Sequence, residues 1–156
     1  SDFTIPRIAQ LILKTNQFNL TTFRYQEEDV RNFAQSKDIW VGCTQTMDKF
    51  GDNGITGVFI VKKNAEHKEW TIDTFLLSCR VMGRGIEDAV MGYILNQAKQ
   101  ERVTRVRAQY IPTKKNKPCE QLLPNSGFKK DGDYWAYSYD VPIKKTDHVE
   151  LTEENV

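Results

Sequence analysis

The chain has 156 residues, enough for a single domain with a sizeable hydrophobic core. Hydrophobic residues make up 39% of the sequence and the formal net charge is +1, so no broad electrostatic field points to nucleic acid or to an anionic membrane. No apolar run is long enough to span a bilayer and no signal peptide opens the chain, so we expect neither a nucleic-acid nor a membrane partner.

The first half of the sequence predicts two helices and four strands. Pro6, followed by Ile8, Leu11 and Ile12, is typical of a short amphipathic helix. The β-branched and aromatic run that begins at Trp70 is typical of a buried strand. The expected elements are a helix over 6–14, a strand over 19–25, a helix over 26–35, a strand over 39–47, a turn over 48–54, a strand over 55–63, a hairpin connection over 64–68 and a strand over 70–79.

The second half predicts one long helix and two further strands. Ile86, Val90, Ile94 and Leu95 recur at helical spacing. The expected elements are this helix to about residue 101, a strand over 104–111, a loop over 112–117, a short helix over 118–123 and a strand over 134–141. From position 142 the sequence is polar and acidic without periodicity. We therefore expect one domain over 1–141 and a disordered tail over 142–156.

Two glycines and an arginine stand between the strand that begins at Trp70 and the long helix. The sequence there reads Arg80-Val81-Met82-Gly83-Arg84-Gly85. Glycines let the backbone approach a ligand closely, and the first helical turn offers unpaired N–H groups to a phosphate. The pattern Arg-x-x-Gly-x-Gly resembles the pyrophosphate loop of GNAT acyltransferases. The alternative is an ordinary turn whose glycines only cap and pack.

The order of elements matches the GNAT fold that this loop implies. We expect an α/β (α+β) fold with a mixed, twisted sheet flanked by helices. A doubly wound parallel sheet fits poorly, because its strands would alternate with helices throughout.

Four segments carry a closer resemblance, to the C-terminal GNAT-like half of FkbH-type proteins of HAD-superfamily subfamily IIIC. They are KTNQFNLTT at 14–22, FGDNGI at 50–55, IDTFLLSCR at 72–80 with GRG at 83–85, and YIPT at 110–113 with KN at 115–116. The first two segments also have a structural interpretation. The first could fasten the entry helix to a strand, and Asp52-Asn53-Gly54 in the second is typical of a hairpin turn.

The FkbH-type resemblance implies a larger protein with an N-terminal HAD phosphatase domain, whose DxD segment this chain lacks. The chain begins at Ser1 without Met, which we interpret as a domain cut from such a protein. Some members load a glyceryl group onto an acyl carrier protein, and others act in cell-surface pathways. The GNAT-like half would hold the phosphopantetheine of coenzyme A or of a carrier protein. The residues implied are Ser78, Arg80, Val81, Met82, Gly83, Arg84, Gly85 and Asn116.

Two residues are candidates for catalysis. Asp73 is a carboxylate in an apolar strand, suited either to general-base work or to a structural ion pair. Cys79 lies beside the glycine loop, where a thiolate near a helix N-terminus could carry an acyl group; the alternative is a small core residue. Many GNAT enzymes have a tyrosine acid where this chain has Leu123. Tyr110 and Tyr134 are the nearest alternatives in sequence.

Cysteine usage favours a reduced, cytoplasmic setting. Cys43, Cys79 and Cys119 form an odd, widely spaced set without a CxxC pair, and the two histidines lie far apart, so we expect no metal site. Two functions remain open. The domain is either an acyltransferase, with pantetheine amides held between splayed strands, or a docking module that presents the arm to the HAD domain without chemistry of its own.

Overall fold

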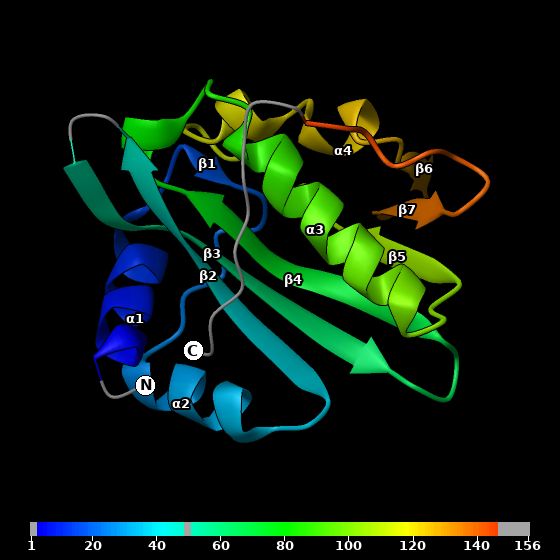
Figure 1. Cartoon of the computed structure of the whole chain (residues 1–156), viewed down its shortest axis with the longest axis horizontal. Coiled ribbons are helices and arrows are strands. Elements are labelled where there is room, and N and C mark those ends of the chain that lie inside the picture. The colour runs from blue at the N-terminus through cyan, green and yellow to red at the C-terminus, as the bar shows by residue number, and fades with distance from the viewer. Residues whose placement is uncertain (1–2, 49–50, 147–156) are drawn as a thin grey trace.

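A twisted sheet forms the centre of the molecule (Figure 1). The computed structural model describes residues 3–48 and 51–146. The strands lie in the order β2-β3-β4-β5-β7-β6, with β1 paired to β4 off this path. The elements are α1 (Thr4–Lys14), β1 (Phe18–Asn19), α2 (Glu27–Gln35), β2 (Ile39–Asp48), β3 (Gly51–Asn64), β4 (Glu69–Leu77), the 3-10 turn η1 (Cys79–Val81), α3 (Ile86–Gln100), β5 (Arg105–Ala108), the 3-10 turn η2 (Lys117–Cys119), α4 (Leu122–Asn125), β6 (Lys129–Asp131) and β7 (Tyr134–Ser138).

Helices cover both faces of this sheet, because the central strands are apolar on both sides. In β3, Phe59 and Val61 pack in the larger core with α3, whereas Val58 and Ile60 pack in a second core with α1 and α2. Alternate residues of a strand face opposite sides, so one strand supplies both cores. Figure 1 shows α3 lying across one face of the sheet. The predicted mixed sheet with flanking helices is confirmed.

The pairing of β4 with its neighbours changes at Asp73. Against β3, Ile60 is opposite Thr74 and Val61 is opposite Ile72, so Asp73 is the extra residue of a β-bulge. Against β5, the parallel pairing runs from Glu69 to Ile72 and stops there. The two central strands therefore separate at the bulge, and Asp73 lies where they part.

The gap between the separated strands is filled by residues 18–21, called the bridging segment below. Phe18 and Asn19 pair with the end of β4, and the N–H of Leu20 donates to the carbonyl of Phe75 at 3.2 Å. On the other side, the N–H of Ile111 donates to the carbonyl of Leu20 at 2.9 Å. The segment thus continues the sheet where β4 and β5 no longer reach each other.

Several predicted boundaries were wrong. The strand expected over 19–25 is only Phe18–Asn19, because Thr22 has a left-handed φ of 54° and the chain leaves the sheet. The turn expected over 48–54 is shorter: β3 begins at Gly51 and pairs with β2 there, while 49–50 lie outside the described residues. The short strand β6 was not predicted. The expected final strand lies beside β5, as β7.

Residues 142–146 run along α3. Ile143 packs against the larger core, and Lys144 forms an ion pair with Asp88 at 3.0 Å. These five residues belong to the tail that we expected to be disordered, and they make defined contacts with the domain. The rest of that tail, 147–156, lies outside the described residues.

Candidate functional site

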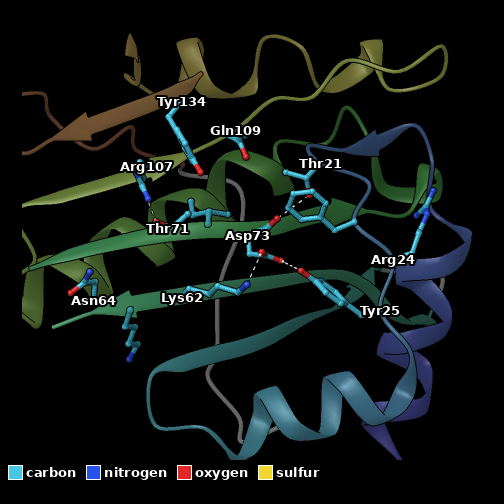
Figure 2. A pocket seen from close by; sticks show the side chains of 13 residues that line it. Thr21, Arg24, Tyr25, Lys62, Asn64, Thr71, Asp73, Arg107, Gln109 and Tyr134 are labelled. Carbon is cyan, nitrogen blue, oxygen red and sulfur yellow. Dashed lines mark hydrogen bonds and ion pairs between the residues drawn. The ribbon is translucent and has the colours of Figure 1, made fainter. Parts of the chain in front are cut away.

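A pocket of about 690 Å³ lies beside the point where β4 and β5 separate (Figure 2). Its wall comes from β3, β4 and β5, from the segment between β1 and α2, and from Tyr134 at the start of β7. Lys62 of β3 lies over the ring of Phe33 in α2, so the pocket opens on the sheet face that carries α1 and α2. Asp73 is the one predicted catalytic or cofactor-binding residue that lines it.

Asp73 joins three elements at the floor of this pocket. The Tyr25 hydroxyl donates to Oδ2 at 2.8 Å, and the Thr74 hydroxyl donates to the same oxygen at 2.9 Å. The Lys62 ammonium lies 3.3 Å from Oδ1. The residue is only 8% exposed, and a buried carboxylate needs such partners to offset its loss of hydration. Both interpretations of Asp73 meet here, since it is buried in an ion pair and also lines a cavity.

The backbone of Asp73 is fixed separately. The Thr21 hydroxyl, at the end of the bridging segment, donates to the Asp73 carbonyl at 2.9 Å. The bridging segment thus bonds the bulge, while Tyr25, four residues further on, bonds its carboxylate. This arrangement holds the carboxylate in one orientation toward the pocket.

Tyr25 is neutral under ordinary conditions. Burial raises the pKa of its hydroxyl well above the usual value, and the hydrogen bond to Asp73 raises it further. Tyr25 therefore acts as a hydrogen-bond donor to Asp73 across the neutral and mildly alkaline pH range.

Sequence reasoning missed both Tyr25 and Lys62. Tyr25 lay inside a segment assigned to a strand, and Lys62 stood in an otherwise apolar strand with no sign of its partner. The useful signal was Asp73 itself, because a carboxylate in a buried strand requires donors nearby. Which donors meet it depends on the bulge, which the residue pattern did not reveal.

The glycine loop lies outside the pocket lining. Gly83 and Gly85 have left-handed φ values of 78° and 79°, and Gly85 directly precedes α3. Both positions thus use the conformational freedom of glycine. The side chain of Val81 is fully buried and Met82 packs against the same core, so neither side chain is placed to contact a ligand at the surface of the loop.

The charges around this loop are mixed. Arg80 and Arg84 are exposed, whereas Glu87 and Asp88 occupy the first turn of α3. Acidic residues stabilise a helix N-terminus, and they also reduce its attraction for a phosphate. Any pyrophosphate bound here would depend on the arginines and on the backbone of the loop. The Ser78 hydroxyl accepts the N–H of Arg80 at 3.4 Å, within the turn itself.

Cys79 is exposed, so its alternative interpretation as a core residue was wrong. It belongs to η1, seven residues before α3 begins; that it lies beside the N-terminus of that helix stays a prediction.

The other two thiols are protected by burial. Cys119 is fully buried, donates to the Asn116 carbonyl at 3.1 Å, and has its pKa raised to about 11 by burial. Burial also raises the pKa of Cys43. Cys79 is consequently the most exposed of the three thiols.

Asn116 holds the bridging segment in place. Its amide nitrogen donates to the carbonyls of Asn19 at 3.0 Å and of Ile111 at 2.9 Å, and its oxygen accepts the N–H of Thr113 at 2.7 Å and the Tyr110 hydroxyl at 3.3 Å. The side chain is fully buried. Its hydrogen bonds are all internal, so a direct contact with a ligand would require one of them to break.

The bridging segment changes one expectation for the ligand. We expected pantetheine amides to bond between the splayed strands. Residues 18–20 instead lie along β4 from Phe75 to Leu77 and use that edge for their own pairing. An extended ligand can take this edge only by displacing the segment; otherwise it lies outside the gap.

The alternative acids occupy different places. Tyr134 lines the pocket, with the Arg107 guanidinium 4.2 Å from its ring centre. Tyr110 lies outside the lining and its hydroxyl bonds Asn116, while burial raises its pKa. Leu123 is buried in the larger core. Of these residues, only Tyr134 presents a hydroxyl to the pocket.

Of the helices described, none has both the length and the apolar character needed to cross a bilayer. Within residues 3–48 and 51–146, no group of three or more His, Cys, Asp or Glu side chains is placed to bind a metal ion.

Comparison with known proteins gives structural matches only. No sequence model of a known protein family matches the chain, and no curated protein matches it in sequence. The ribosomal-protein-S18-alanine N-acetyltransferase of Escherichia coli aligns with a TM-score of 0.65 and 11% identity, over 97% of this chain and 96% of that one.

Two further matches were solved with coenzyme A. A Mycobacterium tuberculosis protein in complex with CoA and NLQ has a TM-score of 0.62 and 18% identity, over 84% of this chain and 69% of that one. Aminoglycoside acetyltransferase AAC(6')-Ib in complex with coenzyme A has a TM-score of 0.63 and 12% identity, over 90% and 92%. At these identities the likeness concerns the fold, and the chain has the fold of the GNAT acetyltransferases.

Proposed function

We propose that the chain is an acyltransferase domain that takes an acyl group from coenzyme A or from a carrier-protein phosphopantetheine. The observation that carries the proposal is the glycine loop between β4 and α3 in a GNAT fold, with both Gly83 and Gly85 left-handed. The CoA complexes of two structural neighbours support coenzyme A as the donor. The backbone from Arg80 to Gly85, with both arginines, would bind the pyrophosphate.

In this proposal Cys79 receives the acyl group first. Its thiolate attacks the thioester carbonyl, a new carbon–sulfur bond forms, and the donor thiolate leaves and takes up the proton that Cys79 released. The exposure of Cys79 and the burial of Cys119 support this choice of thiol. The acceptor nucleophile then attacks the Cys79 thioester, its bond to the acyl carbon forms as the carbon–sulfur bond breaks, and the Cys79 thiolate leaves. Asp73 is the proposed base that takes up the proton lost by the acceptor.

The FkbH-type resemblance makes the proposal more specific. It suggests a glyceryl or related acyl group, a carrier-protein partner, an N-terminal HAD phosphatase domain and a cytoplasmic location. The structural neighbours do not bear on these points. One structural observation fits the resemblance: the first of its four segments is the bridging segment with its flanks, and the last contains Asn116, which bonds it.

A second candidate function is a docking module without chemistry of its own. The bridging segment favours it, because the β4 edge expected to bind pantetheine is already paired. In that case the donor would be held at the glycine loop and presented elsewhere.

Intact-protein mass spectrometry after mixing with acyl-CoA or acyl-carrier protein distinguishes the two functions. We expect an acyl adduct on the wild-type domain that disappears in Cys79→Ser and persists in Cys43→Ser. If the donor thiol is released but no adduct forms on the protein, the acyl group is transferred directly to the acceptor and not through an acyl-enzyme. A donor that stays intact with the domain in excess would favour the docking module.

A further inference from the structure

The charges of the pocket are arranged in two layers. Four cationic side chains and one carboxylate line it. Two of the cations are the more exposed partners of ion pairs with buried or half-buried carboxylates: Lys62 is 48% exposed over Asp73 at 8%, and Arg107 is 36% exposed beside Glu69 at 19%. A ligand entering the pocket therefore meets ammonium and guanidinium groups before it meets a carboxylate.

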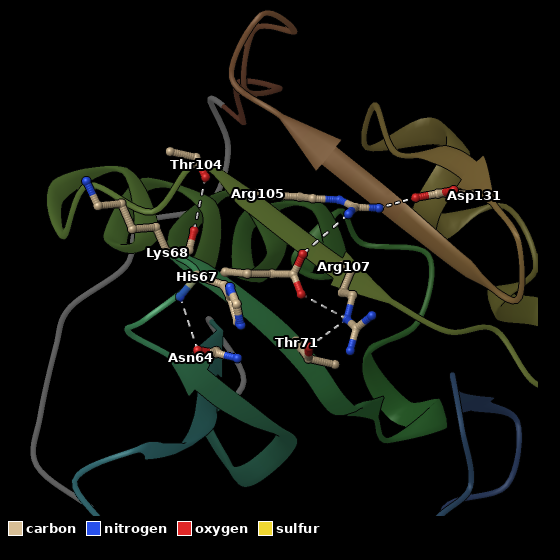
Figure 3. A network of polar contacts seen from close by, with 9 residues as sticks. Asn64, His67, Lys68, Thr71, Thr104, Arg105, Arg107 and Asp131 are labelled. Atoms are coloured by element: carbon tan, nitrogen blue, oxygen red, sulfur yellow. Dashed lines mark hydrogen bonds and ion pairs between the residues drawn. The ribbon is translucent and has the colours of Figure 1, made fainter.

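Arg107 is held in place through its Nε and through the face of its guanidinium. Its Nε donates to the Thr71 hydroxyl at 3.0 Å and lies 3.3 Å from Glu69 Oε1 (Figure 3). The face of the guanidinium lies against the ring of Tyr134. Among the described residues no hydrogen bond involves its two terminal nitrogens. These nitrogens form a planar fork, which matches a carboxylate or phosphate in bidentate geometry.

Further donors stand next to this fork. The Gln109 amide and the Tyr134 hydroxyl both line the pocket, and neither has a hydrogen bond within the described part of the chain. Lys62 projects from β3 on the other side of β4, toward Asp73 (Figure 2). The donors come from β3, from β5 and the residue after it, and from β7, and they line one cavity, so the folded sheet positions them without a ligand.

The same arrangement disfavours a cationic amine as ligand. Asp73 is the one carboxylate in the lining, and its two oxygens already accept Tyr25, Thr74 and Lys62. An ammonium group would find few free acceptors there and would face two exposed cations.

We propose that this pocket binds a small anionic molecule through a carboxylate or phosphate, held by the terminal nitrogens of Arg107 and by Lys62. The claim that this anionic molecule is the acceptor of the acyl group rests on the proposed function. The claim that the pocket binds an anion does not rest on it.

Matched sugars test the charge requirement. Gluconate, glucose 6-phosphate and glucose share a six-carbon polyhydroxy skeleton and carry a carboxylate, a phosphate or no charge. Calorimetric titration of the full chain should give binding of at least one anion and none of glucose. The stronger anion identifies the preferred group. Equal binding of glucose, or no binding of either anion, would overturn the proposal.

Substitutions then locate the site. Arg107→Gln and Lys62→Gln should each weaken binding of the anion by about tenfold or more, because each removes a charged hydrogen bond. Arg107→Lys keeps the charge and loses the fork, and should also weaken binding. Lys99→Gln, at an exposed position on α3, is the matched control and should leave the affinity unchanged. An equal loss in the control would place the anion elsewhere.

A parallel titration with CoA keeps the two proposals separate. The Arg107→Gln chain should keep the CoA affinity of the wild type, which also shows that it is folded. If the wild-type chain binds gluconate but not CoA, the proposed function fails and the anion site stands. If it binds CoA and neither anion, the anion site fails alone.

Discussion

Replacing Asn116 with leucine is expected to lower the free energy of unfolding by about 3 kcal/mol or more. Leucine has a similar size but no polar atoms, so the carbonyls of Asn19 and Ile111 and the N–H of Thr113 would lose their partner inside the protein. Each buried group left without a hydrogen bond costs about 1–3 kcal/mol. Urea unfolding followed by tryptophan fluorescence measures the change.

Asn125→Leu provides the control for this substitution. Asn125 is exposed at the end of α4, and the same change there should alter stability by no more than about 0.5 kcal/mol. If the two variants are equally stable, Asn116 does not hold the bridging segment. A destabilised Asn116→Leu chain with an unchanged tertiary structure would locate the cost in the lost hydrogen bonds.

Replacing Gly83 with valine is expected to reduce CoA binding below detection while the thermal transition shifts little. The φ of Gly83 is 78°, a conformation that a β-branched residue rarely adopts, so the loop must change shape. A Cβ at this position would meet no atom within 4 Å, so the core is not disturbed. Calorimetric titration with CoA measures the affinity.

Gly132→Val tests whether the effect belongs to the loop. Gly132 also has a left-handed φ, of 63°, and open space around it, but it lies in the turn between β6 and β7. The same backbone strain there should leave CoA binding intact. If Gly83→Val binds CoA with unchanged affinity, this loop is not the binding site of the pyrophosphate.

The periodic elements could be predicted from the sequence because one strong pattern decided each of them. Ile8, Leu11 and Ile12 define the buried face of α1, and Val90, Ile94 and Leu95 define that of α3. These helices pack through many apolar contacts, and small local effects do not change them. The strand that begins near Trp70 was predicted for the same reason.

The bridging segment could not be predicted, because its conformation depends on contacts distant in sequence. Asn116 lies 97 residues from Asn19, and β4 offers an unpaired edge only because the sheet separates at Asp73. The local sequence around Asn19 and Thr21 suggested either a strand or a cap, and both were partly right. Two residues pair as a strand, and side-chain hydrogen bonds fix the rest.

Some residues of the candidate site could likewise be predicted from the sequence, and others could not. Asp73 could be identified from the sequence as a carboxylate in an apolar strand, and the glycine loop from its flanking strand and helix. The partners Tyr25, Lys62 and Arg107 could not, because they come from separate elements whose arrangement depends on the bulge and on strand order. Cys79 is the exposed thiol of the three, and its role in acyl transfer stays a prediction.

The most direct test of the central claim is a backbone amide NMR titration of the chain with CoA. The proposed pyrophosphate site predicts large, saturable shifts for the amides of Arg80, Met82, Gly83, Arg84 and Gly85. If the bridging segment stays in place, the amides of Leu20 and Ile111 keep their shifts, because their hydrogen bonds persist. Loop amides that remain unchanged at saturating CoA would contradict the claim that this domain uses the glycine loop to bind its acyl donor.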